Sequence, residues 1–200
     1  MKPTWKFLAA AFLACAMMSV SCDNETDETP VPGLRGDLAA GTTLTDKITA
    51  DATLTEGANY KLSGGLHVKA GATLRIEPGV QLEAVYDEIP DYILIEQGAR
   101  IDAQGTVSNP IVMTSELKEA GAWGGIHICG RAHTNAGTGV LSEIGNAPYG
   151  GSDDADNSGT LRYIRLEYTG FTLDEEHEAN GVSFYGVGNG TTVEYLQAYK

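Results

Sequence analysis

The sequence predicts an all-β fold, a right-handed parallel β-helix, and a short repeated phrase carries this prediction. Through residues 65–103, apolar residues lie two positions apart with polar residues between them, which is typical of short, half-buried strands. Glycines between the strands let the backbone turn a corner without strain. The phrase starts at Leu66, returns eight residues later at Leu74, and appears again at Ile93, 27 residues after the first copy. Self-similarity at a fixed period indicates a solenoid, so we expect Ile93 to stack on Leu66. By the same offset, Ile101 should stack on Leu74.

The first 21 residues are typical of a secretory signal peptide. Lys2 and Lys6 form its positive end, residues 7–18 form an apolar run, and small residues at 19–21 precede Cys22. The apolar run is too short to span a bilayer comfortably. We therefore expect export, and no helix outside this leader.

Cys22 follows small residues at the end of the leader, which resembles the lipobox of bacterial lipoproteins. In a lipobox, the cysteine becomes the acylated first residue of the mature protein. The usual Leu three places earlier is Ser19 here, but relaxed lipoboxes of Bacteroidota-type lipoproteins often end in Ser-Cys. The resemblance implies a palmitate-type anchor at Cys22 and location in the outer membrane. The alternative is an ordinary signal peptide cleaved nearby, with Cys22 as a plain thiol.

Residues 22–35 are predicted to be a flexible acidic tether, and residues 36–200 the β-helix domain. The first part of the tether is polar and acidic and contains no apolar residues that could form a core. An acidic stretch behind a lipidated cysteine resembles the signal that displays Bacteroidota-type lipoproteins on the cell surface; the alternative is a solvated linker. The residues that would carry such a signal are Asp23, Glu25, Asp27 and Glu28.

The charge of the chain excludes one class of partner. The formal net charge is -14, and removal of a leader containing Lys2 and Lys6 makes the mature chain still more negative. Binding to a phosphate backbone needs a basic footprint. Nucleic acid is therefore not expected as a partner.

Cys129 is the one cysteine left once Cys15 is removed with the leader and Cys22 is lipidated, so the mature chain has no internal disulfide. Its neighbours alternate as in a strand, which predicts a small buried wall residue. The alternative is a reactive thiol whose pKa is lowered by His127 and Arg131.

The remaining segments can be assigned in order along the chain. Residues 31–59 are interpreted as an irregular first coil, and the regular wall begins at Tyr60. Trp123, before a glycine pair, is expected to plug the core or cover a loop. An uncapped β-helix end exposes backbone groups, so the stop at Lys200 favours a chain that continues in a longer protein. Loops are expected at 85–90, 105–110 and 116–122, two long excursions at 131–159 and 172–180, and a strand at 161–168.

Several short sequence motifs of the chain resemble those of a family of Bacteroidota right-handed β-helix surface lipoproteins. The resemblance covers roughly residues 60–200 and implies the fold and the surface location. It brings no catalytic residues, since most members have no assigned function, and it implies further coils beyond the end of this chain. The motifs occupy residues 71–79, 109–115, 123–126, 156–159 and 180–182.

Residues 154–159 place oxygen side chains at alternating positions before a glycine, which predicts a calcium loop with Asp154, Asp156 and Ser158 as ligands. Position twelve of such a loop should be a bidentate Glu, and here it is Arg165. The alternative is a solvated acidic turn.

The function predicted first is a surface module that binds a glycan or another macromolecule without catalysis. A solenoid wall is a long, rigid platform, and the two excursions are expected to form one binding rim. The rival is a polysaccharide lyase or glycoside hydrolase, because β-helices resemble the scaffolds of such enzymes; no spacing among the acidic residues fixes a catalytic pair. The four histidines, His67, His127, His133 and His177, show no zinc-ligand spacing. The residues predicted for the rim are Asp153, Asp174, Glu175, Glu176 and Glu178.

Overall fold

The computed structural model describes residues 33–200, except residue 88 and residues 174–176. The predicted leader, Cys22 and most of the predicted tether lie outside the described residues. Within the described part, every regular element is a β-strand, and there is no helix that could span a membrane. One large sheet with parallel pairing joins fourteen of the strands, and the chain is a right-handed parallel β-helix as predicted.

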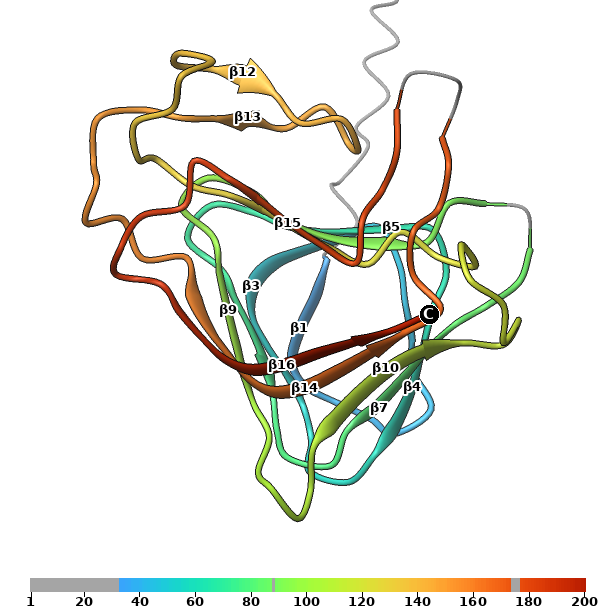
Figure 1. The fold of residues 1–200 in the computed structure, drawn as a ribbon. Helices are drawn as coiled ribbons and strands as arrows, with labels where there is room; N and C mark the ends of the chain where they lie inside the picture. The colour runs from blue at the N-terminus through green and yellow to red at the C-terminus, as the bar shows by residue number, and fades with distance from the viewer. Residues whose placement is uncertain (1–32, 88, 174–176) are drawn as a thin grey trace, which may run out of the picture. The chain divides into compact units, whose positions relative to one another are not determined.

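The strands stack on three faces that enclose a common core (Figure 1). Face 1 contains the start of β3 (Lys47–Leu54), β5 (Gly65–Val68), β8 (Tyr92–Ile95), β11 (Ile126–Cys129) and β15 (Val182–Tyr185). Face 2 contains β1 (Leu34–Leu38), the end of β3, β6 (Thr73–Ile76), β9 (Arg100–Gln104), and the first parts of β14 (Gly159–Glu167) and β16 (Thr192–Tyr199). Face 3 contains β2 (Thr43–Leu44), β4 (Asn59–Leu62), β7 (Gln81–Ala84), β10 (Ile111–Ser115), and the ends of β14 and β16.

The 27-residue offset sets the strand register. Ile93 lies in register with Leu66, and Ile101 lies in register with Leu74. All four side chains are fully buried. Both stacking predictions are therefore confirmed, and the apolar member of each alternating pair fills the core.

Glycines turn some corners of the solenoid, but tyrosines turn others. Gly71 and Gly98 have φ angles of 86° and 81°, which confirms the predicted glycine corners. Within β14 the chain instead turns from face 2 to face 3 at Tyr163, whose φ is 49°. The nearly alternating stretch at 161–168 is therefore one strand with a corner in it.

The regular wall begins earlier than the sequence indicated. β3 pairs with both β5 and β6, and β4 pairs with β7. The irregular first coil thus ends before Lys47 rather than at residue 59. The irregularity of this first coil is a register shift between Leu34 and Gly36 in β1.

The long excursion between β11 and β14 covers the outer surface of face 1. It carries an antiparallel pair, β12 (Val140–Leu141) and β13 (Pro148–Tyr149), which Figure 1 shows beyond β15. Ala147 of this excursion packs with Leu94 and Cys129 in a second, small core. Burial raises the pKa of Cys129 to about 11, so it is the predicted buried wall residue and not an activated thiol.

Trp123 lies in the main core, as predicted. Its side chain is 1% exposed, and its Nε1 donates to the carbonyl oxygen of Glu167 at 2.8 Å. The ring therefore joins the loop before β11 to the end of β14.

Candidate functional site

A groove of about 620 Å³ lies on the outer surface of face 3. Its lining comes from successive coils, so it runs along the axis of the solenoid, with an advance of about 4.8 Å per coil. The lining residues are Gly41, Asn59, Tyr60, Lys61, Gln81, Glu83, Val112, Thr114, Lys118 and Glu167.

Strand register explains why polar side chains gather there. Successive residues of a strand point to opposite faces, so the residues beside the buried Tyr60 and Leu82 point outward. Lys61 pairs in register with Glu83, which pairs in turn with Thr114. The parallel ladder thus converts one outward position per coil into a continuous row of polar groups.

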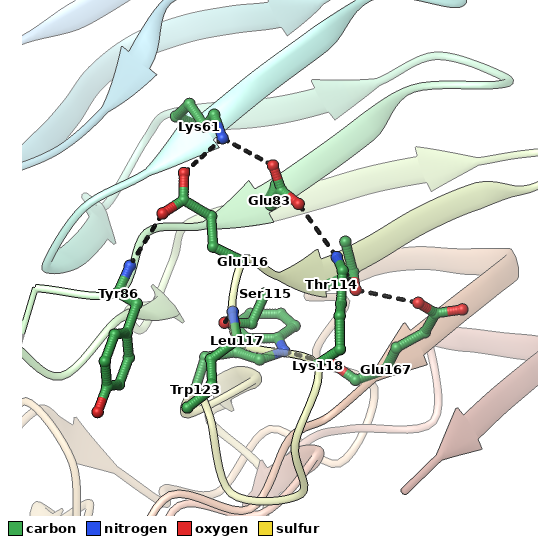
Figure 2. A network of polar contacts seen from close by, with 10 residues as sticks. All are labelled: Lys61, Glu83, Tyr86, Thr114, Ser115, Glu116, Leu117, Lys118, Trp123 and Glu167. Carbon is green, nitrogen blue, oxygen red and sulfur yellow. Dashed lines mark hydrogen bonds and ion pairs between the residues drawn. The ribbon is translucent and has the colours of Figure 1, made fainter.

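Glu83 lies between two lysines at the centre of this row (Figure 2). Its Oε2 is 2.7 Å from Lys61 Nζ, and its Oε1 is 3.0 Å from Lys118 Nζ. Lys61 also contacts Glu116 Oε1 at 2.7 Å. Two lysines and two carboxylates therefore share one chain of ion pairs.

Glu167 closes the row at the other end. Thr114 Oγ1 donates to its Oε2 at 3.0 Å, and Arg165 Nε lies 2.7 Å from its Oε1. Both carboxylate oxygens of Glu167 therefore have partners, and its backbone carbonyl holds Trp123 (Figure 2).

The loop after β10 brings Glu116 and Lys118 back over face 3. Glu116 N donates to Ala84 O at 2.9 Å, which fixes the start of the loop beside the end of β7. Tyr86 N donates to Glu116 Oε2 at 3.4 Å. Lys118 Nζ lies 3.2 Å from Thr114 Oγ1 and 5.9 Å from the centre of the Tyr168 ring. The groove is thus bordered by a loop that shares its ion pairs.

The electrostatics of the groove favour ionised carboxylates. Hydrogen bonds from Lys61 and Lys118 lower the pKa of Glu83, and Lys61 lowers the pKa of Glu116. The two glutamates in turn raise the pKa of Lys61. A general acid needs a raised pKa, so these two glutamates are suited to accept hydrogen bonds and not to donate a proton.

The predicted calcium ligands have separate partners in the structure. Asp154 Oδ1 accepts from the backbone N of His133 at 3.0 Å and lies 2.8 Å from His133 Nδ1. Asp156 Oδ2 accepts from Ser158 Oγ at 3.1 Å. Among the described residues, no group of three or more His, Cys, Asp or Glu side chains converges as a metal site. Calcium binding by this loop stays a prediction.

The predicted binding rim is described only in part. Asp153 and Glu178 are both exposed, whereas Asp174, Glu175 and Glu176 lie outside the described residues. The two excursions border a common cleft of about 420 Å³, lined by residues 143–146 of the first and Leu173 of the second. Neither Asp153 nor Glu178 lines that cleft.

A further polar cluster lies on face 1. His67 Nδ1 is 2.9 Å from Glu96 Oε1, and His67 Nε2 is 3.0 Å from the Tyr92 hydroxyl. Lys69 Nζ contacts the same carboxylate at 2.5 Å. Burial raises the pKa of Tyr92, so this chain of contacts does not activate its hydroxyl.

Reasoning from the sequence missed the groove on face 3. Lys61 and Glu83 are 22 residues apart, but Thr114 and Glu167 are 53 apart because a long excursion intervenes. No fixed period links them. The sequence does carry one sign of the groove: each of the face-3 strands β4, β7 and β10 has a polar residue between two buried ones.

These features define a parallel β-helix protein with an open polar groove along one face. The chain matches the family model of the pectate-lyase-like β-helix domain over residues 46–200 and belongs to that family. Comparisons with curated proteins and with solved structures found no match.

Proposed function

We propose that this protein is a lipid-anchored surface protein that binds glycans in the groove on face 3 without cleaving them. The observation that carries the proposal is the pairing of the groove's carboxylates. Glu83 contacts two lysines and Glu167 contacts an arginine and a threonine. Paired carboxylates and exposed amides supply acceptors and donors for sugar hydroxyl groups.

The same pairing argues against hydrolysis in the groove. A glycosidase needs one carboxyl group that stays protonated to serve the leaving oxygen and a second that stays ionised. The pKa of Glu83 and that of Glu116 are both lowered, so neither glutamate serves as the acid.

A glycan array tests the binding function directly. The full chain, purified in detergent, should bind a defined group of glycans, and a variant with Asn59→Ala and Gln81→Ala in the groove should lose them. Gln104→Ala is the control, because it removes an exposed amide from face 2. Equal binding by both variants would mean that the groove is not the binding site.

The location is also a proposal, supported by the lipobox resemblance at Cys22. Lipidation there would hold the protein in the outer membrane, facing outward. Cells grown with labelled palmitate should label the wild-type protein, while Cys22→Ala should lose the label and release the protein. Label retained in that variant would contradict the anchor.

The family description favours a second function, a polysaccharide lyase or glycoside hydrolase. This alternative predicts release of reducing ends or unsaturated products from a panel of polysaccharides, measured with and without calcium. Binding without product release would support the first proposal, and catalytic turnover would replace it.

A further inference from the structure

We infer, on the basis of the proposed glycan binding, that the face-3 groove selects neutral polysaccharides and rejects acidic ones. The charge balance of the groove, its uncharged hydrogen-bonding positions and its direction along the solenoid lead to this ligand class.

The two lysines that line the groove, and Arg165 at its border, already have carboxylate partners within the chain. Lys61 contacts Glu83 and Glu116, Lys118 contacts Glu83, and Arg165 contacts Glu167. The charges of these cations and carboxylates therefore cancel. A uronate carboxylate in the groove would add a fourth negative charge to three cations that three carboxylates already balance, and it would approach a chain of net charge -14.

Three successive positions beside this row are uncharged, and Arg165 follows them in register. Asn59 pairs in register with Gln81, which pairs in turn with Val112. The side chains of Asn59 and Gln81 are exposed, and their amides make no hydrogen bond to other described residues. An amide both donates and accepts, as a sugar hydroxyl does. Val112, half-buried between them and Arg165, offers an apolar contact for the C–H face of a sugar ring.

The geometry suits a chain and not a single sugar. Equivalent side chains recur with each coil at about 4.8 Å, which is close to the length of one sugar unit in an extended polymer. The groove extends from Gly41 to Glu167 across successive coils. A linear neutral polysaccharide lying along the axis would meet the same pair of rows at each step.

Affinity electrophoresis of the full chain in detergent tests the inference. The gels contain a mixed-linkage glucan, a galactomannan or an arabinan as neutral probes, and polygalacturonate or alginate as acidic probes. We expect at least one neutral probe to retard the protein with little dependence on salt. Gln81→Ala should weaken that retardation by about two- to tenfold, the effect of losing one neutral hydrogen bond, while the face-2 control Gln104→Ala should leave it unchanged.

The outcomes separate the inference from the function on which it rests. Retardation by acidic probes alone, weakened by salt, would overturn the neutral class while glycan binding stands. Retardation by neutral probes that survives Gln81→Ala would overturn the groove as the site. No retardation by any probe, together with an empty glycan array, would overturn glycan binding itself.

Discussion

Faces 1 and 3 are built from the same kind of strand, yet the outward side chains at the centre of β8 and β11 on face 1 are covered, whereas the outward charged side chains of face 3 stay accessible. On face 1, the outward residues Leu94 and His127 are fully buried. Leu94 packs with Ala147 of the excursion between β11 and β14, and His127 contacts the rings of Tyr92 and Tyr185. On face 3, Glu83 keeps about a third of its side chain exposed, and its partners are other charged groups. An insertion at one corner therefore decides which wall of the solenoid is left for a ligand.

Two carboxyl groups in neighbouring turns, Asp91 and Glu83, have pKa values that are shifted in opposite directions. Asp91, directly before β8, is 2% exposed, and burial raises its pKa to about 7. Glu83 has two lysine partners that lower its pKa. Asp91 is thus buried without a cation nearby among the described residues, whereas Glu83, one turn earlier, is partly exposed and paired with two lysines.

The largest expected effect concerns packing under the excursion. Leu94→Ala should lower the free energy of unfolding by about 2–5 kcal/mol, because it removes a buried side chain from the second core. Val112→Ala is the matched control, an outward aliphatic residue of face 3 that is half-buried, and it should cost about 1 kcal/mol or less. Urea unfolding measures both. Equal costs would mean that the excursion does not seal face 1.

The predicted calcium loop offers the next test of the excursion. If Asp154, Asp156 and Ser158 bind calcium, the ion should stabilise the folded chain by about 2.7 kcal/mol at a hundred times its dissociation constant. Magnesium should stabilise less, because it requires a stricter octahedral geometry. Thermal melts in chelator, calcium and magnesium test this. Equal shifts with both ions, or a calcium shift that survives Asp154→Ala with Asp156→Ala, would rule out the site.

Asp91 should make stability fall as pH rises. Its pKa in the folded chain, about 7, is above its ordinary value of 3.8, so the folded state binds a proton that the unfolded state releases. The stability from this proton is fully present below pH 3.8 and lost as pH rises through 7. Asp91→Asn keeps an acceptor for Gly64 N, which donates to Oδ1 at 2.5 Å.

We therefore expect Asp91→Asn to be more stable than wild type by about 1–3 kcal/mol at pH 8, with the difference disappearing below pH 4. Urea unfolding across this range gives the profile. A difference that does not change with pH would show that Asp91 is not protonated in the folded chain.

The smallest effects are expected at exposed ion pairs. Glu83→Gln removes a partly exposed carboxylate from two lysines, so it should cost less than about 1 kcal/mol at pH 7. Because the pKa of Glu83 is lowered in the folded chain, this stability is present at neutral pH and is lost as pH falls through the lowered value. Asp102→Asn on face 2, whose carboxylate is 3.6 Å from Arg75 Nε, should cost less still. A pH-independent cost for Glu83→Gln would point to packing instead of charge.

The sequence predicted the wall better than the site. Leu66 and Ile93 repeat at a constant offset because each fills the same place in the core, so their stacking could be read directly. The corner at Tyr163 could not, because left-handed backbone is expected at glycine and not at tyrosine. The groove was hidden for another reason. Its side chains meet through register, and loops of different length between coils remove any period from their positions.

The central claim is that a glycan lies on face 3 and not on face 1, and lysine footprinting tests it most directly. Lys61 and Lys118 line the groove, while Lys69 on face 1 is ion-paired with Glu96 and serves as the internal reference. The three side chains are similarly exposed, at 38%, 48% and 40%. The full chain is acylated with and without a polysaccharide that it binds, and the modification of each lysine is followed by mass spectrometry. We predict slower modification of Lys61 and Lys118 in the complex and an unchanged rate at Lys69. Protection of Lys69 with no change at Lys61 and Lys118 would contradict the account.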